Sequence, residues 1–206
     1  MTKRGSTKRW LQRQSTDPFV KQRKQQGLRS RAAFKLDELI AKDRLISAGG
    51  KVVDLGAAPG GWAQRMAEIV GPKGTVVAVD LLEMAPIAAV NFIQGDICDP
   101  ETISQVVEIT GKNNADLVLS DMAPNITGIR DADEANFLRI ADAVLSVAAY
   151  VLREDGALIL KLFQFPGTDE LVRELKTQFS RVSRRKPAAS RKQSKEFYVV
   201  ASGYKL

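Results

Sequence analysis

Residues 51–64 have the sequence KVVDLGAAPGGWAQ. A short apolar run ends in an acid, a glycine-rich turn follows, and the next residues can begin a helix. This order is typical of an open α/β sheet, in which ligands bind beyond the carboxyl ends of the strands. Glycines let the backbone approach a ligand closely, and the helix N-terminus presents unpaired N–H groups. The glycines are Gly56, Gly60 and Gly61, so the dinucleotide pattern G-x-G-x-x-G is absent, and no Walker A Gly-Lys-Ser/Thr follows.

Apolar runs alternate with helical patterns through the rest of the chain. The runs VVDL, VVAV, DLVL and ALIL are continuous, as expected for parallel strands buried on both faces. Alternation at this spacing predicts a mostly parallel sheet with helices on both faces. We expect strands at residues 51–55, 74–79, 90–93, 115–120, 157–162 and 197–202, and helices at residues 30–41, 62–70, 100–110, 133–152 and 168–179.

Length and composition exclude several classes of protein. A chain of 206 residues suits one domain with a real core. The chain has no histidine, which removes the commonest general base, and its single cysteine, Cys98, excludes an internal disulfide and a cysteine zinc site. No apolar run approaches the ~20 residues of a membrane span. The basic N-terminus is not followed by the apolar segment of a signal peptide, so we expect a cytoplasmic protein.

Positive charge is concentrated in two segments, although the net charge is only +7. Residues 1–35 contain 11 Lys and Arg against one acid, and residues 181–195 contain seven and no acid. The remaining residues carry 13 basic and 23 acidic side chains. Clustered cations of this kind are typical of a face that binds a polyanion. The alternative is that both segments are solvated and have no partner.

Three acids stand at or just after the ends of predicted strands. Asp54 ends the first strand, Asp80 the second, and Asp96 follows the third. Because parallel strands end on one edge of a sheet, these acids should converge on one crevice. Asp80 is placed to accept from a ribose diol and Asp96 from an adenine amino group, although each taken singly could be a turn or cap residue. Together they favour a nucleotide-type cofactor.

The string D-L-G-x-x-P-G-G-W at residues 54–62 resembles motif I of S-adenosylmethionine-dependent methyltransferases, and more closely its version in FtsJ/RrmJ-type RNA 2′-O-methyltransferases. The resemblance implies the class I methyltransferase fold, which is Rossmann-like with a mostly parallel seven-stranded sheet, and S-adenosylmethionine as cofactor. It implies cofactor contacts at Asp54, Gly56, Pro59, Gly60, Gly61, Trp62, Asp80, Asp96 and Asp121. Asp54 is expected to orient the loop or to reach the methionine amine through water. Trp62 could instead be only a core aromatic at a helix start.

Residues 120–125, SDMAPN, follow the fourth predicted strand, where methyltransferases of this class place groups that contact the substrate. Amino-group methyltransferases have an aromatic residue in this motif, and its absence here disfavours methylation of a base nitrogen. Methylation of a pyrimidine C5 needs a cysteine nucleophile, and Cys98 lies outside any such motif. An oxygen acceptor is therefore expected.

A ribose hydroxyl is a poor nucleophile that needs alignment and a proton acceptor. Lys161 lies in the otherwise apolar strand ALILKLF, where a charge is costly to bury unless it is paired. A second cation close to Lys161 would favour its uncharged form, which can act as a base, and Lys35 on the first predicted helix could supply that cation. Taken alone, Lys35 could be a solvated helix residue and Glu196 a charge on an edge strand.

Four of these residues resemble the K-D-K-E tetrad of FtsJ/RrmJ-type enzymes in order and context: Lys35, Asp121, Lys161 and Glu196. The flanking strings are SRAAFKL, SDMAPN, KLF and KEFYVVA, and the match extends from about residue 29 to the C-terminus. The resemblance implies that Lys161 accepts the proton or orients the hydroxyl, that Asp121 positions Lys161, and that Lys35 and Glu196 complete the polar network. Which lysine removes the proton stays open.

The resemblance is closest to the large-subunit ribosomal RNA branch, and it implies methylation of a uridine 2′-hydroxyl in the A loop. Residues 1–28 would form a basic RNA-binding arm and residues 29–206 the methyltransferase domain. The expected partner is ribosomal RNA or the large ribosomal subunit, with no membrane, no metal and a monomeric enzyme. Two alternatives are a transfer RNA 2′-O-methyltransferase and a non-catalytic RNA-binding ribosome-assembly factor. A small-molecule O-methyltransferase would leave both cationic segments unexplained.

Overall fold

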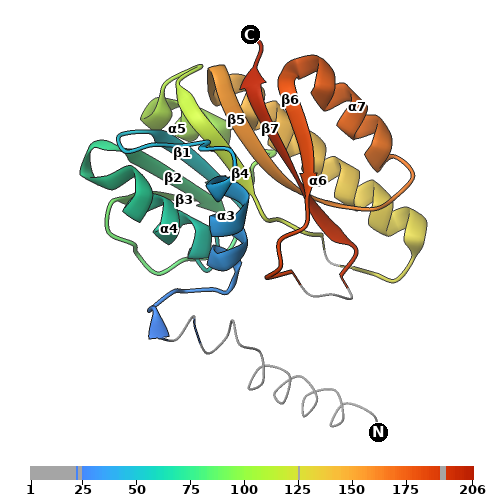
Figure 1. Ribbon diagram of the computed structural model, residues 1–206, viewed down its shortest axis with the longest axis horizontal. Helices are drawn as coiled ribbons and strands as arrows, with labels where there is room; N and C mark the ends of the chain where they lie inside the picture. Colours follow the sequence, from blue (N-terminus) through green and yellow to red (C-terminus); the bar gives the residue numbers. More distant parts are fainter. Residues whose placement is uncertain (1–21, 23–24, 125, 191–193) are drawn as a thin grey trace, which may run out of the picture.

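The computed structural model describes residues 22, 25–124, 126–190 and 194–206. In this part of the chain a seven-stranded sheet has the strand order β3-β2-β1-β4-β5-β7-β6 (Figure 1). Five strands are parallel: β1 (Lys51–Leu55), β2 (Thr75–Asp80), β3 (Val90–Gln94), β4 (Ala115–Ser120) and β5 (Leu152–Phe163). The last two are β6 (Phe179–Arg185) and β7 (Glu196–Tyr204), and β7 is antiparallel to both β5 and β6.

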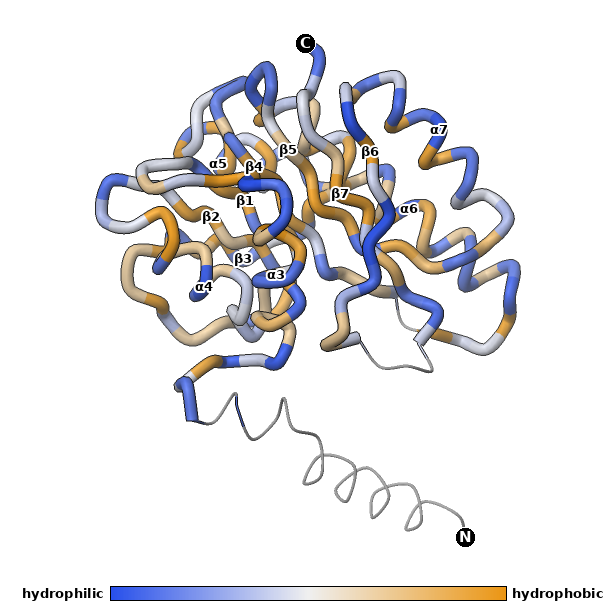
Figure 2. The backbone as a smooth tube through the Cα atoms, viewed as in Figure 1, coloured by the Kyte–Doolittle hydropathy of each residue, from blue (hydrophilic) through white to orange (hydrophobic). Residues whose placement is uncertain are grey.

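Helices cover both faces of this sheet, as the alternating sequence predicts. One face carries α3 (Ala32–Ala41) and α4 (Gly61–Val70), which is followed by the 3₁₀ turn η1 (Gly71–Lys73). The other face carries α5 (Pro100–Thr110), α6 (Arg130–Val151) and α7 (Thr168–Gln178). In Figure 2 hydrophobic residues follow the central strands, and hydrophilic residues alternate with hydrophobic ones along the surrounding helices and loops.

Two apolar cores form because successive strand side chains point to opposite faces of the sheet. In β4, Leu117 and Leu119 pack in the core beneath α3 and α4, whereas Val118 packs in the core beneath α5, α6 and α7. Burial on both faces explains why these strands are continuously apolar in sequence.

The strand order reverses direction between β1 and β4, which are hydrogen-bonded neighbours. β1 continues to β2 on one side, while β4 continues to β5 on the other. In an open α/β sheet, the carboxyl ends at such a reversal border a crevice that binds ligands. The loop after β1 and the segment after β4 therefore border the crevice in which a ligand is expected.

The structure differs from the sequence prediction mainly at one strand. We expect a helix to Phe179 and no strand in the basic stretch, but α7 ends at Gln178 and β6 begins at Phe179. β6 is an edge strand paired only with β7, and charged side chains on an edge discourage pairing with other chains. Its charged residues hide the apolar alternation on which strand prediction depends.

Two smaller differences lie at helix ends. The long helix α6 begins at Arg130 rather than at residue 133, and β5 begins at Leu152 rather than at the expected residue 157. Arg31 is the N-cap of α3, and the hydroxyl of the preceding Ser30 accepts a hydrogen bond from the backbone N–H of Ala32 (3.0 Å).

Most of the predicted basic arm, residues 1–21 and 23–24, lies outside the described residues. Among the residues that the structure describes, no helix is long and apolar enough to cross a membrane. In the same part of the chain, no group of three or more Cys, Asp or Glu side chains could hold a metal ion.

Candidate active site

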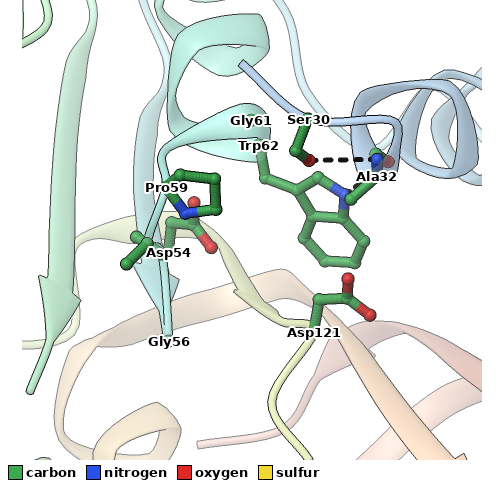
Figure 3. A pocket seen from close by; sticks show the side chains of 10 residues that line it. Ser30, Ala32, Asp54, Gly56, Pro59, Gly61, Trp62 and Asp121 are labelled. Atoms are coloured by element: carbon green, nitrogen blue, oxygen red, sulfur yellow. Dashed lines mark hydrogen bonds between the residues drawn. The ribbon is translucent and has the colours of Figure 1, made fainter. Parts of the chain in front are cut away.

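A cavity lies at the carboxyl ends of β1 and β4, where the strand order reverses. Six of the residues predicted to contact the cofactor line it: Asp54, Gly56, Pro59, Gly61, Trp62 and Asp121. Ser30 and Ala32, from the start of α3, form another part of its wall. Figure 3 shows the Asp54 and Asp121 carboxylates, the Trp62 indole and Pro59 around this space.

The glycine loop adopts a backbone conformation that would be strained with residues other than glycine. Gly56 has φ 77° and Gly60 has φ 96°, both in the left-handed region that favours glycine. A Cβ on Gly56 would also collide with the side chain of Met122. The loop continues through the cis Ala58–Pro59 bond to Gly60, which is the N-cap of α4. Its glycines therefore let the chain turn tightly at the cavity wall.

Asp54 is a buried carboxyl at the base of this cavity, with 1% of its surface exposed. Its Oδ2 atom has no hydrogen-bond partner in the described structure. Burial, with further repulsion from the Asp121 and Asp80 carboxylates, raises the pKa of Asp54 to about 8. A buried carboxyl with one unpartnered oxygen is costly to ionise unless that oxygen meets a cation, so this cavity favours a positively charged ligand.

The raised pKa of Asp54 predicts that the ligand-free protein loses stability as pH rises. Asp54 binds its proton up to about pH 8 in the fold, whereas an ordinary aspartate ionises near pH 3.9 when unfolded. The folded state then holds more protons than the unfolded state across this window, so the free energy of unfolding falls by at most about 1.4 kcal/mol per pH unit.

An Asp54→Asn variant should lose this fall in stability between pH 5 and pH 8. Urea unfolding of the variant and the wild type at both pH values measures the difference. The exposed Asp142→Asn variant is a matched control that should keep the wild-type dependence. Parallel pH profiles for wild type and Asp54→Asn would contradict the prediction.

Three predicted cofactor residues, Gly60, Asp80 and Asp96, do not line the cavity. Asp80 ends β2 and accepts hydrogen bonds from the backbone N–H groups of Ala58 (2.8 Å) and Leu82 (2.8 Å), which ties the glycine loop to β2. Asp96 is exposed and accepts from the backbone of Cys98 (2.9 Å). Their contacts with a cofactor stay predictions.

Trp62 is a core aromatic residue that also lines the cavity. Its indole is 3% exposed and belongs to the core beneath α3 and α4. Its Nε1 donates to the carbonyl of Ala32 (2.7 Å), and its ring lies 5.9 Å from that of Tyr198. The same side chain lines the cavity and fastens α3 against α4.

The four residues of the predicted tetrad come together from four separate elements. Lys35 lies on α3, Asp121 directly follows β4, Lys161 lies in β5, and Glu196 begins β7. Lys35 Nζ pairs with Glu196 Oε1 (2.6 Å), and Lys161 Nζ pairs with Asp121 Oδ1 (3.1 Å). Lys161 Nζ also donates to the backbone carbonyl of Asp121. Both ammonium groups are therefore buried beside carboxylates in one cluster.

Tyr198 connects the two ion pairs, and the sequence analysis missed it. Its hydroxyl accepts from Lys35 Nζ (3.0 Å) and donates to Asp121 Oδ1 (2.5 Å). Tyr198 is fully buried in β7, two residues after Glu196. Residues two apart in a strand share a face, so that spacing was the available signal, but FYVV looks like an ordinary apolar strand.

The surroundings favour an ionised Glu196 and a neutral Tyr198. Burial alone would raise the pKa of Glu196, but the hydrogen bond and charge of Lys35 outweigh it and lower that pKa. Burial, followed by the nearby Asp121 carboxylate, raises the pKa of the Tyr198 hydroxyl far above its ordinary value. Tyr198 is therefore a hydrogen-bonding bridge and not an acid at physiological pH.

A second hollow adjoins the first on the side of the tetrad. Its wall contains Arg31, Lys35, Ser194 and Glu196, and it shares Ser30, Ala32 and Asp121 with the first cavity. Two ligands, one bound in each hollow, would both lie next to Asp121. This arrangement suits the transfer of a group from a donor in the first hollow to an acceptor in the second.

Comparison with known proteins gives the family. The family model described as FtsJ-like methyltransferase matches residues 28–204. Two curated relatives are named ribosomal RNA large subunit methyltransferase E. The relative from Marinobacter nauticus is 47% identical over 206 residues, covering 100% of both chains. The relative from Xanthomonas campestris pv. campestris is 46% identical over 198 residues, covering 96% of this chain and 94% of the relative.

A solved structure described as a ribosomal RNA methyltransferase from Plasmodium falciparum has the same architecture. It superimposes with a TM-score of 0.75 at 27% identity, covering 85% of this chain and 98% of the other. The expected class I methyltransferase fold is thus confirmed. Since the family model covers nearly all of the described chain and the full-length relatives are almost half identical, this protein belongs to the FtsJ-like methyltransferase family.

Proposed function

We propose that this enzyme transfers a methyl group from S-adenosylmethionine to a ribose 2′-hydroxyl of RNA, at a uridine in the A loop of large-subunit ribosomal RNA. The observation that carries the proposal is the contact of Lys35, Asp121, Lys161 and Glu196 in one buried cluster, where the two hollows meet. The names of the relatives, which specify the large ribosomal subunit, support the choice of substrate.

The residues of the first hollow fit S-adenosylmethionine, whose sulfonium and ammonium groups are both cationic. Asp54 offers a carboxylate oxygen without a partner, and Asp121 offers a second acid at the border with the acceptor hollow. A cation beside Asp54 would offset the cost of ionising this buried acid. When bound, S-adenosylmethionine supplies an electrophilic methyl group.

On the acceptor side, Lys161 is placed to orient the hydroxyl and accept its proton. The carboxylate and the backbone carbonyl of Asp121 both hold Lys161 Nζ, so the amine has a fixed position beside the residue that lines both hollows. Lys35 is held by Glu196 and Tyr198 instead. We assign proton acceptance to Lys161 because it is bound to the residue that lines both hollows, whereas Lys35 lines only the second.

The proposal extends to partners and location. The basic arm of residues 1–28 would add phosphate contacts, since clustered cations supply sequence-independent affinity for RNA. The methyltransferase domain of residues 29–206 would act as a monomer, without a metal, in the cytoplasm. The substrate would be the large ribosomal subunit or its RNA.

Ribose-methylation mapping of ribosomal and transfer RNA tests this function. Mass spectrometry should find that cells lacking the gene lose one 2′-O-methyluridine from large-subunit RNA. A plasmid-borne wild-type gene should restore the methyl group, and the matched Lys161→Ala gene should not. Loss of a transfer RNA methyl group would favour the transfer RNA enzyme instead. Unchanged methylation of every RNA would favour the non-catalytic assembly factor.

A further inference from the structure

One face of α3 packs against the basic segment that connects β6 to β7. Arg31, just before the helix, and Lys35, Glu38 and Lys42 follow one another at spacings of four, three and four, so their side chains lie on the same side of the helix. Opposite them lie residues 184–190 and 194–196. We call this contact line the α3 seam.

Hydrogen bonds join the two sides of the α3 seam near its middle. Arg31 Nη2 donates to the carbonyl of Ala189 (2.6 Å). The Glu38 carboxylate accepts from the backbone N–H groups of Ala188 (2.7 Å) and Ala189 (3.1 Å). These bonds hold residues 188 and 189 against α3.

A hollow lies on either side of these hydrogen bonds. The first is the acceptor hollow, with Arg31, Lys35 and Glu196 in its wall. The second lies toward the end of α3, and its cations are Lys42, Arg184, Arg185 and Lys186. Residues 31 and 42 are separated by about 16 Å along the helix axis, at 1.5 Å per residue. The α3 seam is therefore longer than a single nucleotide and extends beyond the acceptor hollow.

The cations of the second hollow differ in what they already contact. Arg184 pairs with Asp169, and Arg185 pairs with Asp43 (3.3 Å), so carboxylates partly neutralise both. Lys42 and Lys186 are exposed, and the contact found for Lys186 Nζ is a neutral carbonyl, that of Ser194 (2.9 Å). Lys42 and Lys186 thus bring positive charge to opposite sides of the hollow.

We propose that the RNA strand carrying the acceptor ribose runs along the α3 seam, with Arg31 contacting the phosphate beside that ribose and Lys42 and Lys186 contacting a phosphate further along the strand. The inference rests on the proposed function, because it requires an RNA acceptor. A planar guanidinium suits phosphate recognition, and Arg31 stands in the wall of the acceptor hollow itself. In Figure 2 the hydrophilic run of β6 and the segment after it lies beside α3.

The test compares a Lys42→Ala/Lys186→Ala double variant with a Lys73→Ala/Lys112→Ala control of equal charge. Lys73 and Lys112 are exposed and precede β2 and β4, so they lie at the amino ends of these strands and line neither the acceptor hollow nor the second hollow of the seam. The substrate is large ribosomal subunits from cells that lack the gene, and the methyl-transfer rate gives KM and kcat at several salt concentrations.

We expect KM for subunits to rise about three- to ten-fold in the seam variant, with kcat changed less than two-fold. Each lost phosphate contact should also reduce the slope of log affinity against log salt by about 0.7 to 0.9. The control should keep the wild-type KM and slope. Arg31→Ala should raise KM for subunits by a similar factor. An unchanged KM would show that Arg31 does not contact the RNA strand at the α3 seam.

Two results would overturn the inference. The seam and control variants could have the same KM, or the seam variant could have a raised KM with an unchanged salt slope, which would indicate contact with a protein of the subunit. Failure of the proposed function is distinct, since wild-type enzyme would then transfer no methyl group to the subunits at all.

Discussion

A Lys161→Ala variant is expected to lose methyl transfer by about a thousand-fold or more while retaining affinity for S-adenosylmethionine. Lys161 is 8% exposed, and its amine is held by both the carboxylate and the carbonyl of Asp121. A positioned proton acceptor contributes about 10²- to 10⁴-fold to a rate, and this variant also loses the group that orients the hydroxyl. Single-turnover methylation of ribosomal subunits measures the effect, and calorimetry measures cofactor binding.

Lys161→Arg separates proton acceptance from charge. Arginine keeps the positive charge but does not lose a proton in proteins, so this variant should be nearly as inactive as Lys161→Ala. The exposed Lys176→Ala variant is the matched control and should have wild-type turnover. Substantial activity in Lys161→Arg would show that the charge, rather than the free amine, is required. Near-normal turnover in Lys161→Ala would remove Lys161 from the mechanism.

A Tyr198→Phe variant should have a kcat reduced by about 10- to 100-fold. It removes only the hydroxyl that joins Lys35 Nζ to Asp121 Oδ1, and the ring beside Trp62 remains. Hydrogen bonds to charged groups contribute about 1.5–3 kcal/mol, and each 1.36 kcal/mol of barrier is a factor of ten in rate. The measurement is kcat and KM for both substrates, with the melting temperature measured in parallel.

The control for this variant is Tyr150→Phe, because Tyr150 is 52% exposed on α6 and lies outside both hollows. Its kinetics should equal those of the wild type. If Tyr198 positions the cluster, kcat should fall while KM for S-adenosylmethionine stays within about two-fold. A lowered melting temperature with unchanged kcat would show instead that the hydroxyl only stabilises the fold.

The sheet and the glycine loop were predictable because their signals are local. Continuous apolar runs at 76–79 and 157–160 specify strands buried on both faces, and those strands pair in the parallel part of the sheet. The glycines after β1 predict a tight turn at the strand end, and the structure has left-handed backbone at Gly56 and Gly60. Strand β6 escaped prediction because its edge position permits charged residues where a central strand would be apolar.

The amino-acid sequence by itself determined which side chains stand at the ends of the strands, and thereby the family to which the chain is similar. Only the tertiary structure decided that Tyr198 joins the two ion pairs, that Asp80 bonds to the glycine loop, and that α3 closes against the basic connection after β6. Periodicity records which face of an element is buried. It does not record which distant element covers that face, because the contact depends on the packing of the whole sheet.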